Sequence, residues 1–367
     1  MEYLTYKYKM YSRCDRNKYL HRDIDAFAGV YNHFIALHKR YYSRFNKYPS
    51  KFTLINHLTK LKRTTRFAHW CLLPSQALQN VIERIDFGYQ KFFARDNKRP
   101  PTFRSKFRYL SYTLKQAGYK FLEGNKVRIG KRVFRYHKSR CFDADSIKTV
   151  TIIRDRVGDL WLCVVAKAEG IKQVIAKNGK TAGFDFGLKT YLTASDNTRT
   201  QSPLFFSRNT RQIKKANRNL SRKQKGSNNR HRARLHLAKV HRHVANQRRD
   251  YHWRLAHHLC KEYDIVCFEK LNIKAMQTLW GRKINDLGFA NFLTILKYVA
   301  QKTGKKVKQL NQWLPTSKTC SACGTVKEDL PLRERTFRCP CGLEIDRDLN
   351  AAINIHRWGH PPMQEVA

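Results

Sequence analysis

The chain has 367 residues, and its 74 Lys and Arg against 27 Asp and Glu give a formal net charge of +47. An ordinary metabolic enzyme of this size has no need for such an excess, which indicates a polyanionic partner. Because 41% of the residues are hydrophobic and 12% aromatic, the chain can form real cores, and a disordered basic tail is excluded.

No apolar run approaches the roughly 18 to 20 residues of a membrane helix, and no apolar signal segment follows Met1. We therefore expect a protein of the reducing cytoplasm with no membrane partner. The ten cysteines agree with this, because four of them crowd into one short stretch, which is typical of a metal site rather than of disulfides.

The first half of the chain predicts a β structure interrupted by helices. Residues 3–11 (YLTYKYKMY) alternate as a strand does, and a single strand needs partners elsewhere. Apolar residues recur at helical spacing between about residues 23 and 98, which predicts three or four helices. Residues 102–166 then alternate β-rich stretches with turn residues. We expect the first strand to join this small barrel-like β domain, which makes the helical block an insertion.

The second half predicts strands alternating with helices. Residues 180–195 predict a hairpin around Gly187. Residues 197–249 contain no acidic residue, so their Lys and Arg must face phosphate or solvent. A long amphipathic helix is predicted from about His231 onward. Four further elements follow: a strand ending at Glu269, a helix over about 285–303, the strand KVKQL and a final helix in DRDLNAAINIHRW, with a loose tail after Gly359.

Four cysteines form two close pairs, CSAC and CPC, in a short polar stretch. This is the arrangement in which two knuckles supply four thiolates to one tetrahedral zinc, and four thiolates leave no open position for chemistry. A single residue separates the second pair, where a zinc ribbon usually has two, which predicts a distorted knuckle. The alternative is ordinary buried cysteines. The predicted zinc ligands are Cys320, Cys323, Cys339 and Cys341, and the predicted packing cysteines are Cys14, Cys71, Cys141, Cys163, Cys260 and Cys267.

Three carboxylates stand in apolar or tightly patterned contexts in this acid-poor chain. Asp185 lies between two phenylalanines of a strand, where an unpaired charge is costly to bury. Glu269 ends an apolar strand, and Asp348 begins the final helix ahead of small residues. Together they can hold two magnesium ions, one activating water and the other stabilising the leaving oxygen of a phosphodiester.

Each of these acids also has a structural alternative. Asp185 can pair with a lysine, Glu269 with the basic helix, and Asp348 can cap the helix that it begins. Asp346 competes with Asp348, because side chains two positions apart on a helix cannot both point into one site.

Four sequence blocks, in this order and spacing, resemble a known family. They are GFDFGLK around Asp185, FEKLNIKAM around Glu269, TSKTCSACG at the first cysteine pair and CGLEIDRDLNAAINI after the second. Segments of the first half, such as PSQALQNVIERID and FFARDNKRPPTFRSKFRYLSYTL, extend the resemblance over nearly the whole chain. The chain resembles the TnpB proteins of bacterial transposons, the ancestors of type V CRISPR effectors.

The resemblance implies an α+β multidomain fold. A β-barrel wedge domain with an inserted helical recognition domain would precede an RNase H-like RuvC α/β nuclease domain that carries a zinc-ribbon insertion. The expected boundaries are 1–15 for the first wedge strand, 16–101 for the recognition domain, 102–176 for the rest of the wedge, 177–313 for the first part of RuvC, 314–342 for the ribbon and 343–367 for the last RuvC helix and tail.

The resemblance also implies an RNA-guided DNA endonuclease. Such a protein binds a transposon-derived guide RNA and cuts double-stranded target DNA beside a short adjacent motif by two-metal hydrolysis. Its catalytic acids map onto Asp185, Glu269 and Asp348, the last preferred over Asp346 by analogy alone. All three acids are present, which argues against the nuclease-dead relatives that act as guided repressors. We expect a monomer in the bacterial cytoplasm, associated with the nucleoid when bound.

The predicted nucleic-acid contacts fall into two groups. The basic stretch is expected to contact phosphates without reading sequence. By resemblance, three residues of the recognition helices are candidates for reading the adjacent motif, and plain helix surface is their alternative. The first group is Arg208, Arg211, Lys214, Lys215, Arg218, Arg222, Lys223 and Lys225, and the second is Lys51, Ser75 and Gln79.

Two other classes of function stay open at this point. One is a nucleic-acid-binding protein without cleavage, such as a guided repressor or an RNA chaperone, and replacing Asp185 by Ala would then change no activity. The other is a transposase or a transposase accessory, which shares the RNase H fold and the acids. It would require the ends of the element as substrates and would work without RNA.

Overall fold

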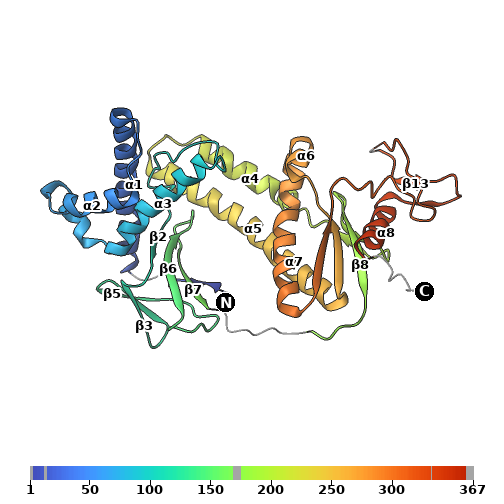
Figure 1. The fold of residues 1–367 in the computed structure, drawn as a ribbon, viewed down its shortest axis with the longest axis horizontal. Coiled ribbons are helices and arrows are strands. Elements are labelled where there is room, and N and C mark those ends of the chain that lie inside the picture. Colours follow the sequence, from blue (N-terminus) through green and yellow to red (C-terminus); the bar gives the residue numbers. More distant parts are fainter. Residues whose placement is uncertain (1–2, 12–14, 168–174, 332, 361–367) are drawn as a thin grey trace. The chain divides into compact units, whose positions relative to one another are not determined.

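The computed structural model describes residues 3–11, 15–167, 175–331 and 333–360 (Figure 1). The chain divides into two compact units, Met1–Gly170 and Ile171–Ala367. Both contain helices and sheets, so the predicted α+β class is confirmed. Cys14 and the tail from residue 361 lie outside the described residues.

The first unit contains the predicted block of helices. In α3 the buried side chains Leu78, Val81, Ile82 and Ile85 are those whose spacing predicts a helix. The Ser50 hydroxyl accepts the Thr53 N–H and so begins α2. The elements are α1 (Asn17–Phe45), α2 (Lys51–Leu61), the 3₁₀ helix η1 (Thr65–Leu72) and α3 (Ser75–Phe93).

The strands of the first unit form two sheets around a core that they share with these helices. The predicted first strand joins the later ones, because β1 pairs antiparallel with β7, Tyr3 opposite Lys167. A bridge between Met10 and Tyr136 connects the two sheets. One sheet has the order β1 (Tyr3–Lys9), β7 (Leu160–Lys167), β6 (Ile147–Arg154), β2 (Ser111–Leu114), and the other β3 (Tyr119–Leu122), β4 (Lys126–Ile129), β5 (Arg132–Arg135).

The isolated cysteines divide into two kinds. Cys163, Cys260 and Cys267 are buried, as predicted for packing residues. Cys71 and Cys141 are exposed, so the packing prediction was wrong for these two. Cys71 belongs to a short 3₁₀ helix with Trp70 as its buried residue, and Cys141 lies in a loop, and neither position offers a core.

The second unit is built on one five-stranded sheet. β8 and β9 form the predicted antiparallel hairpin, while β11 pairs parallel with both β8 and β12. The strands run in the order β10 (Arg199–Gln201), β9 (Thr190–Ala194), β8 (Thr181–Phe186), β11 (Ile265–Glu269), β12 (Lys306–Leu310). This strand order, with these parallel and antiparallel pairings, is that of an RNase H-like domain.

The helices of the second unit follow the basic and apolar patterns. The predicted long helix is α5, which the Ser227 hydroxyl caps by accepting the Arg230 N–H at 3.1 Å. The helix predicted over about 285–303 is α7, which begins after the chain turns at Gly288 with a φ of 62°, while α6 before it was not predicted. The remaining elements are α4 (Phe205–Ser221), α5 (Asn228–Glu262), α6 (Ile273–Leu287), α7 (Phe289–Thr303), β13 (Thr336–Arg338), β14 (Glu344–Asp346) and α8 (Arg347–Gly359). None of the helices in the described part of the chain combines the length and the apolar character needed to span a membrane.

Candidate functional site

Strands β8 and β11 bring Asp185 and Glu269 to one edge of the sheet. Phe184 lies beside Phe268 in the parallel register, so the next step along both strands places the two acids side by side. Neighbouring strands are about 4.8 Å apart, and successive side chains point to opposite faces. Because the rings of Phe184 and Phe268 stack at 5.4 Å within the buried core, both carboxylates point to the other face.

Helix α8 packs on the face of β8 that carries Asp185 (Figure 1). A Cβ on Gly183 would lie 2.3 Å from the His356 nitrogen and 2.4 Å from the Ala352 oxygen, so only glycine allows this approach. Asp185 follows Gly183 by two residues on the same face, and Asp348 precedes Ala352 by one helical turn. The close packing therefore sets Asp348 over Asp185.

The structure separates the roles of Asp346 and Asp348. Asp346 is the N-cap of α8, and its Oδ1 accepts the N–H groups of Asp348 at 2.9 Å and Leu349 at 3.1 Å. The Asp348 carboxylate lies 3.7 Å from the place that a Cβ on Gly187 would occupy, close to the end of β8. The capping alternative therefore applies to Asp346 and not to Asp348.

The three carboxylates are half-buried and repel one another. Burial raises the pKa of Asp185 well above its usual range, and the charges of Asp348 and Glu269 add to the effect. Burial also raises the pKa of Glu269 and of Asp348. Among the described residues no Lys or Arg forms an ion pair with Asp185 or Glu269, and the Arg335 guanidinium lies 3.8 Å from Asp348. The structural alternatives of a lysine partner and a basic-helix partner are therefore wrong.

A second cluster of possible metal ligands lies apart from the acids. Among the described residues, four cysteines place their sulfurs within 4.8 Å of one another.

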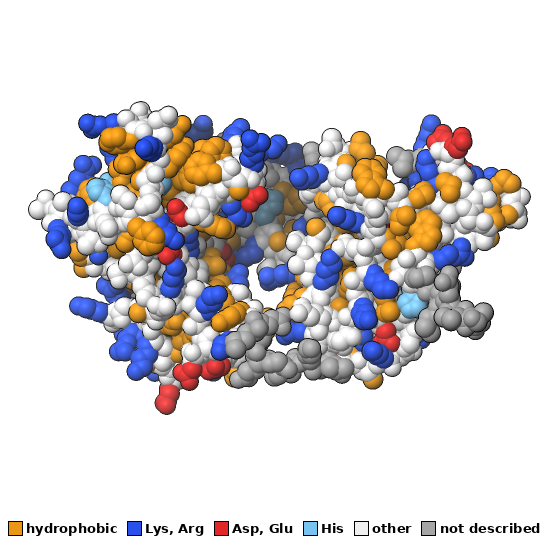
Figure 2. Space-filling model, in the orientation of Figure 1, with side chains coloured by type: hydrophobic (Ala, Val, Ile, Leu, Met, Phe, Trp, Pro, Cys, Tyr) orange, Lys and Arg blue, Asp and Glu red, His pale blue; other side chains and the backbone are white. Residues whose placement is uncertain are grey.

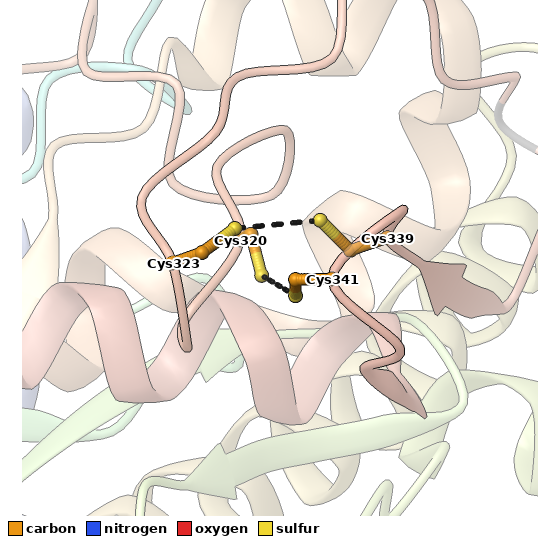
Figure 3. Close-up of side chains that lie close together, drawn as sticks. All are labelled: Cys320, Cys323, Cys339 and Cys341. Atoms are coloured by element: carbon orange, nitrogen blue, oxygen red, sulfur yellow. Dashed lines mark hydrogen bonds between the residues drawn. The ribbon is translucent and has the colours of Figure 1, made fainter.

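The four cysteines point toward a common centre (Figure 3). The Sγ atoms of Cys320 and Cys341 are 3.7 Å apart, and those of Cys323 and Cys339 are 3.5 Å apart. A tetrahedral zinc with sulfur ligands at about 2.3 Å would separate them by about 3.8 Å. The spacing of the sulfurs therefore suits one tetrahedral ion.

The two cysteine turns close in the same way despite their different lengths. The Gly324 N–H donates to the Cys320 oxygen and the Gly342 N–H to the Cys339 oxygen, both at 3.0 Å. Both glycines have positive φ values, 82° and 92°. The second pair has one residue between its cysteines instead of two, but its turn still brings the sulfurs toward the same centre. The Thr325 hydroxyl and N–H lower the pKa of Cys323 to about 6.

Comparisons with known proteins match this architecture. The family model "Probable transposase" matches residues 164–279, and "Cas12f1-like, TNB domain" matches residues 289–355. A Streptomyces pristinaespiralis protein named "Putative RNA-guided DNA endonuclease" is 28% identical over 357 residues, 96% of this chain and 88% of that protein. "TnpB-like protein L79" of Acanthamoeba polyphaga mimivirus is 33% identical over 237 residues, 59% of this chain and 44% of its own length. The chain is thus similar to proteins named TnpB-like and to proteins named RNA-guided DNA endonucleases.

Two further matches are more distant. "Putative RNA-guided DNA endonuclease InsQ" of Escherichia coli (strain K12) is 25% identical to this chain over 362 residues, 92% of this chain and 89% of InsQ. The solved structure "Structure of the mini-RNA-guided endonuclease CRISPR-Cas_phi3" covers 97% of this chain and 92% of its own at 12% identity, with a TM-score of 0.49.

The predicted phosphate contacts lie on α4 and the turn after it. Ile213 and Ala216 are buried, so the basic residues between them and around them face outward. Figure 2 shows Lys and Arg spread over the visible face with few acidic side chains. Seven of the predicted residues are exposed and Lys223 is half-buried; the exposed ones are Arg208, Arg211, Lys214, Lys215, Arg218, Arg222 and Lys225.

The three predicted motif-reading residues stand at the starts of two helices in the first unit. Lys51 is the first residue of α2, half-buried, with its ammonium 5.1 Å from the centre of the Phe52 ring. Ser75 and Gln79 are exposed one turn apart on α3. Their role stays a prediction.

Sequence reasoning missed one residue of the site. The Thr316 hydroxyl donates a 2.8 Å hydrogen bond to Oε2 of Glu269. Thr316 is the first residue of TSKTCSACG, the block that carries part of the resemblance. Nothing in its residue type or spacing predicts this contact, which depends on how the cysteine segment folds back onto the sheet.

Proposed function

We propose that this protein is a member of the TnpB family and an RNA-guided DNA endonuclease that hydrolyses phosphodiester bonds at Asp185, Glu269 and Asp348. The observation that carries the proposal is the meeting of three carboxylates from two adjacent strands and one helix, two of them without a basic partner among the described residues. The two bacterial relatives whose names contain RNA-guided DNA endonuclease align with most of the chain and support it.

The donor set of this site fits magnesium. Carboxylate oxygens are the ligands that magnesium prefers, and mutual repulsion raises the pKa of Asp185 in the absence of a cation. When bound, two magnesium ions would activate a water and stabilise the leaving oxygen of the phosphodiester. The strands fix Asp185 and Glu269, and α8 fixes Asp348, so the protein holds its ligands before substrate arrives.

The four cysteines would hold one structural zinc. Four sulfur ligands leave no open coordination position, so this ion would take no part in hydrolysis. It would instead order the segment between β12 and α8, whose described residues include a short pair of strands, β13 and β14, and a small apolar cluster.

The basic surface of α4 would bind guide RNA through its phosphates. Replacing both Arg211 and Lys215 by Gln should lower the slope of log affinity against log salt by about 1.4–1.8, because each lost phosphate contact removes about 0.7–0.9. Arg254→Gln is the matched control, since Arg254 is exposed on α5 but paired with Asp250 at 2.8 Å. An unchanged slope in the double variant would remove this surface from the proposal.

The proposal also includes the expected domain boundaries, with wedge and recognition roles for the first unit. The protein would act as a monomer, with guide RNA and double-stranded target DNA as partners, in the bacterial cytoplasm.

The test is to purify the protein from cells that carry its native flanking DNA, sequence the RNA that comes with it, and offer DNA that matches that RNA. We expect one dominant RNA with a constant 5′ scaffold and a variable 3′ segment, and magnesium-dependent cleavage of the matching DNA. A random sample of cellular RNA would contradict guidance. A defined RNA with binding but no cleavage would favour a guided repressor.

A further inference from the structure

Thr316 is a buried hydroxyl directed at one of the three carboxylates. Its side chain is 4% exposed and donates to Glu269 Oε2 at 2.8 Å. A hydrogen bond to a charged carboxylate is strong and directional, so it orients the group that accepts it. Thr316 therefore acts on the position of the Glu269 carboxylate.

Thr316 is itself held by helix α8. The Asn354 side chain is 1% exposed, and its Nδ2 donates to the Thr316 oxygen at 2.9 Å and to the Thr319 oxygen at 2.7 Å. A buried amide is costly unless it is hydrogen-bonded, so these two bonds fix the backbone of Thr316 against the helix.

The same face of α8 also forms hydrogen bonds with other residues of the segment 316–321. Asn350 Nδ2 donates to the Thr319 oxygen at 2.7 Å, and its Oδ1 accepts the Ser321 N–H at 2.9 Å. Arg357 donates to the Ser321 oxygen at 2.7 Å. Asn350, Asn354 and Arg357 are spaced by four and three residues, so they form one stripe along the helix.

Helix α8 also carries Asp348. One helix therefore positions Asp348 directly and reaches Glu269, on a different element, through Asn354 and Thr316. The packing of α8 on β8 and β11 already places the helix, and this hydrogen-bonded connection adds a restraint at the Glu269 carboxylate itself.

We infer that Thr316 is a positioning residue for Glu269, and that Asn354, by holding Thr316, fixes Glu269 relative to Asp348. The inference rests on the proposed nuclease function, because its consequence is a defined arrangement of magnesium ligands. Neither residue touches substrate in this account.

The first test compares Thr316→Val, which keeps the shape and removes the hydroxyl, with Thr316→Ser, which keeps the hydroxyl. For the full-length protein with its guide RNA, Thr316→Val should raise the magnesium concentration for half-maximal cleavage about tenfold, since a hydrogen bond to a charged group is lost. Thr316→Ser should stay within about twofold. Thr294→Val is the control, because the Thr294 hydroxyl donates only within its own helix, to the Ala290 oxygen at 2.8 Å.

A second readout is independent of cleavage. Manganese binding to the RNA-free full-length protein is measured by electron paramagnetic resonance, with Glu269→Gln as the reference for a lost ligand. The Thr316→Val variant should bind manganese more weakly than the wild type, as the Glu269→Gln variant does. The Thr316→Ser variant should bind manganese as the wild type does. Equal binding by wild type and Thr316→Val, or equal losses in Val and Ser variants, would overturn the inference.

The role of Asn354 is tested by combining variants. If Asn354 acts through Thr316, Asn354→Leu and Thr316→Val together should be no worse than the worse single variant, because coupled residues are not additive. Fully additive losses would overturn this part. If Asn354→Leu fails to fold, the Thr316 pair still decides the main claim.

These outcomes separate the inference from the function on which it rests. If the wild-type protein neither binds manganese at this site nor cleaves DNA, both the proposed function and the inference are contradicted. If the wild-type protein does both and the Thr316→Val variant is indistinguishable from it, only the inference is contradicted.

Discussion

The four cysteines come from two short turns in neighbouring stretches of chain, whereas the three carboxylates come from two strands and a helix that lie far apart in the sequence. The cysteine sulfurs all lie within 4.8 Å of one another. The geometry of the cysteine cluster is set by local turns that end at Gly324 and Gly342. The geometry of the acid cluster is set by strand register, helix packing and the Thr316 contact.

This difference determines which kinds of substitution disrupt each cluster. A local cluster fails when one of its own ligands is lost. A cluster assembled by the fold also fails when a distant packing contact changes, even though all its ligands are present. The predictions below separate the two cases.

The largest effect is expected for Asp185→Asn. Loss of one magnesium ligand removes several kcal/mol of stabilisation, so guide-directed cleavage should fall more than about a thousandfold. Guide RNA binding and the zinc content of the cysteine cluster should not change, which metal analysis of the purified complex would show. Cleavage within tenfold of the wild type would remove Asp185 from the site.

Cys320→Ser should affect stability rather than chemistry. One lost thiolate should cost about 3 kcal/mol, roughly a quarter of the binding free energy of a four-thiolate structural zinc. Thermal unfolding with and without a chelator measures this loss, and the chelator should destabilise the wild type more than the variant. Cys71→Ser is the control, because Cys71 is an exposed thiol outside the cluster. Full zinc content in Cys320→Ser would contradict the assignment.

Gly183→Ala distinguishes the assembled site from the local one. The new Cβ would lie 2.3 Å from the His356 nitrogen and 2.4 Å from the Ala352 oxygen, both backbone atoms, so α8 must move. Since a displacement of about 1 Å can cost about a hundredfold, cleavage should fall about 10- to 100-fold while the cysteine cluster keeps its zinc. Gly281→Ala is the control, because its Cβ would meet nothing within 4 Å. Normal cleavage by Gly183→Ala would show that α8 does not set Asp348.

The smallest effect is expected for the thermal stability of the metal-free protein when Asp185 is replaced by Asn. The raised pKa of Asp185 means that the folded state binds its proton more tightly than the unfolded state does. This contribution to stability is complete below the usual carboxylate pKa and is lost as the pH rises through the raised value. Asp185→Asn should therefore stabilise the metal-free protein at neutral pH, by about 2–4 °C in Tm for each kcal/mol. A lower Tm would contradict the predicted repulsion.

The sequence was sufficient where a pattern is local. The hairpin around Gly187 and the long helix α5 follow from residue spacing, and they appear in the structure. The two cysteine pairs can also be recognised from their spacing alone. The helix predicted over about 285–303 is α7, but the helix α6 that precedes it across Gly288 was not predicted.

The rest of the site depends on tertiary contacts that spacing does not contain. The choice between Asp346 and Asp348 requires the capping hydrogen bonds, and the exposure of Cys71 and Cys141 requires knowing which elements lack a core. The contact from Thr316 to Glu269 joins two elements through a segment with no regular structure. No periodicity marks such a contact.

The most direct test of the central claim, that Asp185, Glu269 and Asp348 form the hydrolytic site, is guide-directed cleavage by Asp348→Asn beside Asp346→Asn. The two residues are neighbours on one helix end, but only Asp346 caps it. Asparagine caps a helix about as well as aspartate, so Asp346→Asn should cleave within about threefold of the wild type. Asp348→Asn should lose more than about a thousandfold. Cleavage that survives in Asp348→Asn and disappears in Asp346→Asn would contradict the account.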